Sequence, residues 1–145
     1  MESINEIQDA IIDEFSFFGD WMEKYEYIIE LGKDLPLIDA QYKTEDYLVR
    51  GCQSKVWLHA SLEDEKVIFK ADSDAIITKG IIGLLIRVLS GHSPQDILDA
   101  DLYFLDKIGL KEHLSPTRAN GLVSMLKQMK LYALAFQKQL TGKND

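Results

Sequence analysis

The sequence predicts an α+β fold in which a small antiparallel sheet packs against helices from both ends of the chain. Apolar residues recur at helical spacing in the first 32 residues and again from residue 116 to about residue 140. Between these regions, residues 54–71 alternate between apolar and polar side chains, as strands with one buried face do. No repeat, linker or composition break divides the chain, so we expect a single domain over residues 1–145 with a frayed polar tail from about Thr141.

Two helices are predicted in the N-terminal region. Ser3 and Glu6 have the spacing of a capping box, and an apolar stripe follows them. Asp and Ser favour helix starts, whereas Gly favours helix ends. The residues expected to cap or stop the two helices are, in chain order, Ser3, Gly19, Asp20 and Gly32. Residues 34–46 lack a periodic pattern and predict an irregular crossing segment.

The alternating central region predicts a β-hairpin. Strand character begins near Tyr47, and within residues 54–62 one face carries Val56, Leu58, Ala60 and Leu62. An acidic turn at residues 63–65 leads to a second strand in which Val67, Phe69 and Ala71 continue the buried face. The turn lacks the Asn-Gly or Asp-Gly pair that is the strongest short hairpin signal.

A buried central helix is predicted from the segment Asp72-Ser73-Asp74 to about Leu89. The two aspartates are interpreted first as helix caps, and the following residues are apolar nearly all round. Gly80 and Gly83 each cost about 1 kcal/mol of helix propensity relative to Ala, which suggests that another backbone approaches closely. Gly91 should stop this helix.

Two further helix starts carry proline at the first helical position. Ser93-Pro94 predicts a short helix, and Ser115-Pro116 predicts the last and longest one.

Composition and charge exclude several classes of function. The chain carries 16 Lys and Arg against 24 Asp and Glu, a formal net charge of −8. This argues against nucleic acid and an anionic membrane as partners, because both require clustered cations. The longest apolar stretch, residues 75–89, is shorter than the roughly 20 residues of a membrane span. With no secretory signal and one cysteine, we expect a cytoplasmic protein.

Cys52 is the only cysteine, and it lies between Gly51 and the polar pair Gln53-Ser54 at the predicted entrance to a strand. A lone thiol closes no internal disulfide and builds no metal site by itself, so no metal site is expected. Three uses remain open: a buried apolar filler, a catalytic nucleophile, or a carrier that exchanges sulfur with another molecule. The polar neighbours and the loop position favour the last two, and Gly51 lets another molecule approach closely.

A Cys-His hydrolase would need a base in contact with the sulfur. The available histidines are His59, His92 and His113, and none lies in a recognisable hydrolase context. With no resolving cysteine, the chain cannot run a dithiol redox cycle. It could instead accept one sulfur atom as a persulfide and pass it on, and this interpretation fits the sequence better. A carried persulfide is vulnerable to cellular thiols, so we expect Cys52 to be partly sheltered by apolar side chains.

Several motifs in the expected order make the sequence similar to the SufE family of sulfur-acceptor proteins, from Trp21 to about Met129. The motifs are Trp21 with residues 23–25 and 27–32, Leu35-Pro36, Gly51-Cys52-Gln53-Ser54 with Val56-Trp57, Asp72-Ser73-Asp74-Ala75 with Lys79-Gly80, Pro94-Gln95-Asp96-Ile97, and residues 113–118 with Gly121, Leu122 and Met125. Each motif alone is weak, but the series is specific.

The resemblance implies a function. A pyridoxal-phosphate (PLP) cysteine desulfurase, SufS, would donate persulfide sulfur to Cys52, and the chain would deliver it to the SufBCD scaffold complex, with SufB as the expected recipient. The chain would stimulate the desulfurase as an activator and co-substrate rather than act as an enzyme, and it would need no cofactor, since PLP belongs to the partner. A related desulfurase in another sulfur-transfer pathway is the alternative, and monomer and homodimer both remain open.

The resemblance also implies a fold shared with IscU-type cluster scaffolds and roles for other residues. Gly51, Gln53 and Ser54 would shape the cysteine loop. Arg118 would support this loop or contact the desulfurase. Contact with a partner is the second hypothesis for Asp72 and Asp74.

Overall fold

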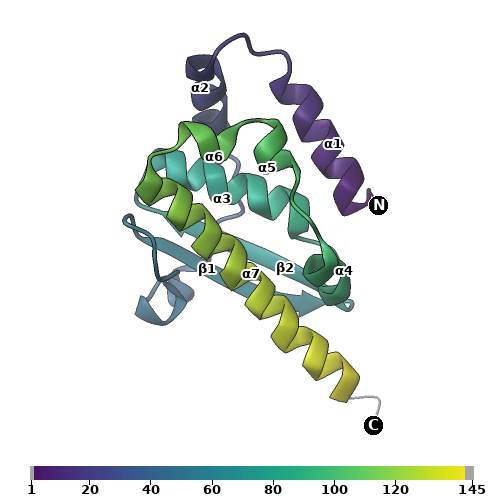
Figure 1. Ribbon diagram of the computed structural model, residues 1–145. Helices are drawn as coiled ribbons and strands as arrows, with labels where there is room; N and C mark the ends of the chain where they lie inside the picture. The colour runs from purple at the N-terminus through teal and green to yellow at the C-terminus, as the bar shows by residue number, and fades with distance from the viewer. Residues whose placement is uncertain (1, 143–145) are drawn as a thin grey trace.

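The computed structural model describes residues 2–142, and these residues form seven α-helices, two 3₁₀ turns and one two-stranded antiparallel sheet (Figure 1). The elements are α1 Ile4–Phe15, α2 Trp21–Gly32, η1 Ala40–Tyr42, η2 Glu45–Tyr47, β1 Val56–Glu63, β2 Lys66–Ser73, α3 Ile76–Leu89, α4 Pro94–Asp99, α5 Phe104–Lys107, α6 Leu110–His113 and α7 Pro116–Gly142. The predicted α+β class is therefore confirmed. Buried residues from Ile4 to Ala133 form one hydrophobic cluster.

The sheet is the predicted hairpin, with Val56 paired to Ser73 at one end and Glu63 to Lys66 at the other. Its inner face is buried as the alternation predicted, except at Leu62, which is only partly buried. The buried side chains on this face are Val56, Leu58, Ala60, Val67, Phe69 and Ala71. The turn consists of Asp64 and Glu65, both with positive φ angles, which matches the twist of the strands even though neither residue is glycine.

Helices cover the inner face of this sheet, with α3 against β2 and α7 against β1 (Figure 1). The α7 side chain of Tyr132 donates a hydrogen bond of 3.1 Å to the carbonyl of Leu58 in β1. The 3₁₀ turn η2 contacts β1, and the ring of Tyr42 stacks on His59 at a centroid distance of 3.9 Å. The strand expected to begin near Tyr47 is wrong: η2 occupies that position, and only Leu48 forms a bridge, to Trp57.

The packing of α2 against α3 explains two of the glycines. A side chain at Gly80 would collide with the carbonyl oxygen of Ile28, so the predicted close backbone approach is confirmed there. Gly32 is the last residue of α2, and a Cβ at this position would lie 2.9 Å from the Gly80 nitrogen, so it serves close packing as well as the helix end. At Gly83 a Cβ would make only ordinary contacts, 3.8 Å from Leu35, so that part of the prediction is wrong.

Most of the predicted helix starts are confirmed. Ser3 and Glu6 form the capping box, Asp20 accepts from the backbone N–H of Glu23, and Ser93 accepts from that of Asp96. The expected stop of the first helix at Gly19 is wrong, because α1 ends at Phe15 and a turn follows.

The last helix also differs from its prediction at its end. Helix α7 continues through Gly142, past Thr141, where a frayed tail was expected. The Thr141 hydroxyl bonds to the carbonyl of Gln137 within the helix. Residues 143–145 of the predicted tail lie outside the described residues.

Candidate functional site

The loop of residues 50–55 carries Cys52 and leads into β1. Gly51 has a φ of +95°, a conformation that side chains disfavour, and a Cβ at this position would collide with the Ser124 hydroxyl of α7. The backbone angle therefore favours glycine, and a side chain at this position would in addition force the Ser124 hydroxyl to move. The sequence predicted that Gly51 shapes the loop, and the structure supplies this physical reason.

A cavity of about 70 Å³ adjoins the cysteine, where the loop meets α3 and α7. Its lining residues are Cys52, Gln53, Ser54, Thr78, Ile81, Thr117, Arg118, Gly121 and Met125. Gln53, Ser54 and Arg118, which the sequence assigned to this site, thus lie together with the thiol, although Arg118 is far from the other three along the chain.

The Cys52 thiol is half-buried and packs against the hydrophobic core. Its Sγ donates a hydrogen bond of 3.5 Å to the backbone carbonyl of Gly121. Burial raises the pKa of the Cys52 thiol above its ordinary value, because a low-polarity environment disfavours the thiolate. The structure confirms the expected sheltering, and it shows a resting state that favours the neutral thiol.

Arg118 is held between two helices. It lies in the first turn of α7, and its guanidinium donates a hydrogen bond to the hydroxyl of Tyr25 in α2. Beside this contact, Trp21 stacks on His113 at a centroid distance of 4.3 Å. Helix α2 therefore positions the cation that lines the thiol cavity.

Asp74 anchors the far end of the cysteine loop instead of capping α3. Its carboxylate accepts a 3.0 Å hydrogen bond from the backbone N–H of Lys55, and its own N–H donates to the Lys55 carbonyl at 3.2 Å. The N-cap position of α3 is Ala75, which provides no side-chain cap. The interpretation of Asp74 as a helix cap is therefore wrong, but its link to the loop keeps it in the site.

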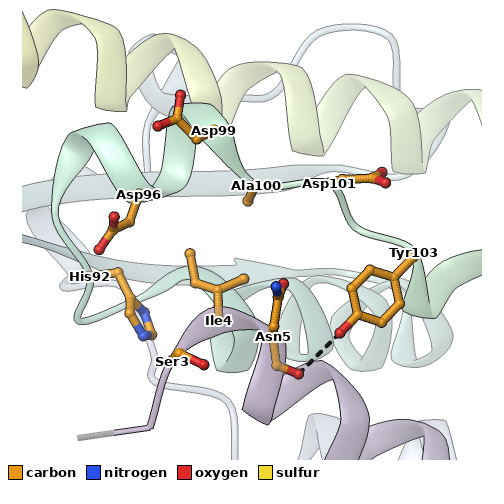
Figure 2. A pocket seen from close by; sticks show the side chains of 9 residues that line it. All are labelled: Ser3, Ile4, Asn5, His92, Asp96, Asp99, Ala100, Asp101 and Tyr103. Carbon is orange, nitrogen blue, oxygen red and sulfur yellow. Dashed lines mark hydrogen bonds between the residues drawn. The ribbon is translucent and has the colours of Figure 1, made fainter.

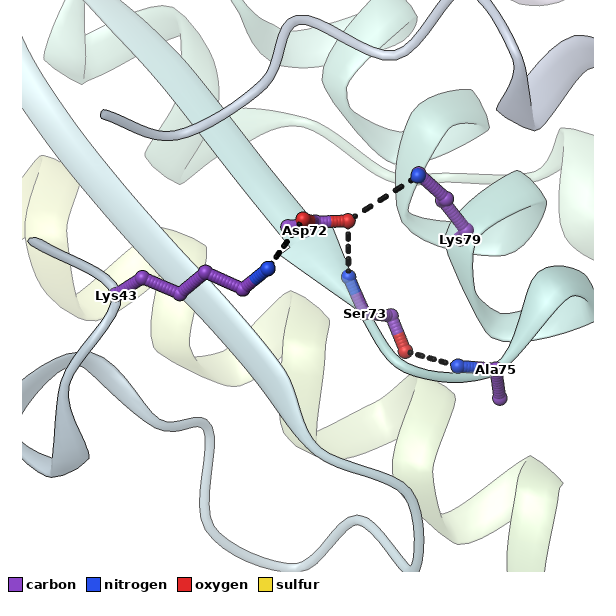
Figure 3. A network of polar contacts seen from close by, with 5 residues as sticks. All are labelled: Lys43, Asp72, Ser73, Ala75 and Lys79. Atoms are coloured by element: carbon purple, nitrogen blue, oxygen red, sulfur yellow. Dashed lines mark hydrogen bonds and ion pairs between the residues drawn. The ribbon is translucent and has the colours of Figure 1, made fainter. Parts of the chain in front are cut away.

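Asp72 is likewise not a cap, since it is a residue of β2 that joins three segments (Figure 3). Its carboxylate lies 2.9 Å from Lys43 Nζ and 3.3 Å from Lys79 Nζ, and it accepts the Ser73 N–H at 2.8 Å. The Ser73 hydroxyl in turn accepts the N–H of Ala75. Partial burial of Asp72 opposes its ionisation, but these hydrogen bonds outweigh burial and lower its pKa. Its role in the structure is to stabilise the strand–helix junction.

Several lining residues were not assigned to the site from the sequence. Thr78 and Ile81 come from α3. This helix is apolar nearly all round, so its sequence does not indicate which face lines the site. Gly121 and Met125 occur in the segments that resemble the known family, and their spacing of four on one helix face is the signal that could have identified them.

None of the three histidines lines the thiol cavity. His113 stacks on Trp21, and His59 stacks on Tyr42. His92 is buried, with Nε2 3.0 Å from the Glu2 carbonyl oxygen. The base that a Cys-His hydrolase needs is therefore missing from the described surroundings of Cys52.

A larger cavity of about 460 Å³ lies elsewhere, between the start of α1 and the region around α4 (Figure 2). Asp96, Asp99 and Asp101 line it, and the Tyr103 hydroxyl donates to the Asn5 carbonyl at its edge. Within residues 2–142, no cluster of His, Cys, Asp and Glu is arranged to hold a metal ion. In the same part of the chain, no helix is both long and apolar enough to cross a membrane.

One protein family matches most of the chain: the family described as SufE, Fe-S metabolism associated domain, matches residues 9–133. A SufE-like protein of Rhizobium meliloti is 43% identical over 127 residues, covering 84% of this chain and 91% of its own length. A SufE-like protein of Synechocystis is 38% identical over 127 residues, covering 88% of this chain and 80% of its own length.

Two further similarities extend the comparison. SufE-like protein 1, chloroplastic/mitochondrial, of Arabidopsis thaliana is 44% identical over 123 residues, which are 84% of this chain but 33% of that protein. The solution structure of a hypothetical protein from Thermus thermophilus superimposes with a TM-score of 0.76 at 23% identity, covering 91% of this chain and 96% of its own. This structural match shows a shared fold.

Proposed function

The chain belongs to the SufE family, and we propose that it carries sulfur from a donor protein to an acceptor protein as a persulfide on Cys52. Family membership links the chain to sulfur transfer in iron–sulfur metabolism. The observation that supports the proposal best is the placement of the only thiol, which lies on a loop beside a small cavity that partly shelters it.

The donor in this proposal is SufS, a PLP-dependent cysteine desulfurase that holds sulfur as a persulfide on its own cysteine. The Cys52 thiol gives up its proton, and the thiolate attacks the terminal sulfur of that persulfide. A new S–S bond forms at Cys52 Sγ, the donor's S–S bond breaks, and the donor cysteine leaves as a thiolate. One sulfur atom changes carrier without an external oxidant or reductant.

The buried state of the thiol sets a requirement on this step. Because burial raises the pKa of Cys52, little thiolate is present in the free protein at neutral pH. Docking on the donor must therefore expose the loop and place Cys52 in surroundings that favour the thiolate. The same shelter protects the persulfide from other thiols once the loop has returned.

Delivery to the SufBCD scaffold complex completes the proposed cycle in the cytoplasm, with SufB receiving the sulfur. By clearing the persulfide from SufS, the chain speeds the desulfurase as an activator and co-substrate. It is not itself an enzyme in this proposal, and PLP remains with the partner.

The test uses purified desulfurase, L-cysteine and the full chain. We expect Cys52 to gain about 32 Da, one sulfur atom, by mass spectrometry of the intact protein. Cys52→Ser should still bind the desulfurase but lose its stimulation, since the surface remains and the acceptor sulfur is gone. An unmodified Cys52, or full stimulation by Cys52→Ser, would disprove the proposal.

A further inference from the structure

Helix α7 has a charge opposite to that of residues 1–115. Residues 1–115 carry 11 Lys and Arg and 23 Asp and Glu, a formal charge of −12. Helix α7 contains no Asp or Glu and four cations, namely Arg118, Lys127, Lys130 and Lys138. Such a separation of charge creates an electrostatic field that can steer and orient a charged partner as it approaches.

Exposed apolar residues alternate with two of these lysines along one side of α7. The members of this α7 stripe, at steps of three or four residues, are Val123, Lys127, Leu131, Leu134 and Lys138. Val123, Leu131 and Leu134 are 53%, 48% and 39% exposed. At a rise of 1.5 Å per residue the α7 stripe is about 22 Å long.

The two lysines of the α7 stripe are not used inside the molecule. Lys130, on another side of the helix, donates to the carbonyls of Leu98 and Ala100 and so fastens α4 to α7. Within residues 2–142, Lys127 and Lys138 have no ion pair or hydrogen bond from their side chains. They remain available to a partner.

The α7 stripe begins beside the thiol site. Val123 lies between Gly121, which contacts Cys52, and Ser124, which crowds Gly51. Figure 1 shows α7 running from this end of the molecule past α4, with its last turns projecting beyond the body. A protein that reaches Cys52 from this side is therefore adjacent to the α7 stripe.

From this arrangement we propose that the α7 stripe is a docking surface for the sulfur donor, which contributes an apolar ridge flanked by Asp and Glu side chains. The inference rests on the proposed function, because that function brings the donor to Cys52. Opposite charges would speed and orient the encounter, and the apolar residues would be buried in the complex. An anionic membrane would be repelled by the charge of −12 on residues 1–115, and two copies of the chain, at −8 each, would repel one another.

The experiment measures desulfurase stimulation against carrier concentration, using purified desulfurase and L-cysteine. We expect Lys127→Glu/Lys138→Glu to raise the half-saturating concentration about tenfold and to reverse its dependence on salt. Leu131→Gln should raise it without changing the salt dependence. In both variants, loading of Cys52 at saturating carrier should match the unmodified chain, because the thiol cavity is unchanged.

The matched control is Lys70→Glu/Lys107→Glu, which makes the same change of net charge at two exposed lysines outside α7. If this control shifts half-saturation as much as the α7 variant, the effect is one of net charge and the inference fails. It also fails if neither α7 variant shifts half-saturation while the unmodified chain loads sulfur normally. Absence of loading in the unmodified chain would instead disprove the proposed function.

Two more measurements test other occupants of the α7 stripe. If sedimentation shows self-association that Lys127→Glu/Lys138→Glu abolishes, the surface is an interface between copies and the donor assignment is overturned. Co-sedimentation of the chain with vesicles containing phosphatidylserine, lost in the same variant, would overturn it too.

Discussion

Gly121 places its backbone carbonyl 3.5 Å from Cys52 Sγ, so the backbone of α7 closes one side of the thiol cavity. A Cβ at this position would lie 3.4 Å from the sulfur, which is ordinary contact and leaves no free space between them. The absence of a side chain at residue 121 therefore determines how much room remains beside the thiol.

We expect Gly121→Ala to stabilise the protein and to slow the loading of sulfur onto Cys52. Ala favours a helix interior over Gly by roughly 1 kcal/mol, and its methyl would fit against the sulfur without collision. The free energy of urea unfolding should rise by about 0.5–1 kcal/mol, while sulfur loading of Cys52 slows several-fold. Gly142→Ala, which adds the same methyl in open space, should leave loading unchanged. Equal loading rates in the two variants would contradict this role for Gly121.

Removing the Asp74 carboxylate should loosen the cysteine loop. The carboxylate accepts the Lys55 N–H at 3.0 Å, so Asp74→Ala leaves that end of the loop with one fewer restraint. We expect the rate of Cys52 alkylation by iodoacetamide to rise several-fold at neutral pH. Asp74→Asn keeps an acceptor oxygen and should show a smaller increase. If Asp74→Ala is labelled at the original rate, the anchor does not limit exposure of the thiol.

The Asp72 network predicts a pH-dependent loss of stability. Because the folded-state pKa of Asp72 is lowered, its stabilising effect is present above the unfolded-state pKa and is lost as pH falls through the folded-state pKa. Asp72→Asn should therefore lower the free energy of unfolding by about 1–2 kcal/mol at pH 7. The difference should shrink toward zero below about pH 3. A difference that stays constant from pH 7 to pH 3 would mean that the carboxylate charge is not responsible.

The pH dependence of thiol reactivity should report the burial of Cys52. Since burial raises its pKa, the midpoint for alkylation of the folded protein should lie above about 8.5, the ordinary value for cysteine. In urea the midpoint should return to the ordinary value, and this measurement serves as the control. A midpoint in the folded protein below that in urea would show that a nearby cation, with Arg118 the first candidate, outweighs burial.

The parts of the fold that follow local rules were predictable from the sequence. The capping box at Ser3, the proline after Ser93 and the alternation through the hairpin each act within a few residues, and each was found as predicted. The exposed turn at Asp64 and Glu65 was located, but its positive φ angles were not, because they are set by strand twist rather than by glycine.

The parts of the site that depend on tertiary contacts were not predictable in the same way. Asp72 and Asp74 have good capping side chains, yet lysines and a backbone N–H from distant segments compete for their carboxylates, and α3 begins without either as a cap. Cys52 and Arg118 were each identified from the sequence as candidate site residues. Only the packing of α7 against the loop shows that they share a cavity with Thr78 and Gly121.

The close contact between Gly32 and Gly80 has a consequence for repeated transfer. It joins α2, which holds Arg118 of α7 through Tyr25, to α3, which supplies Thr78 and Ile81, so the two helices that line the thiol cavity are linked through a third. If the loop swings out to meet a donor, as proposed, we expect these three helices to keep their arrangement. The recess left behind would then be preformed for the returning cysteine, and each round of the proposed sulfur transfer would begin without refolding of the helices.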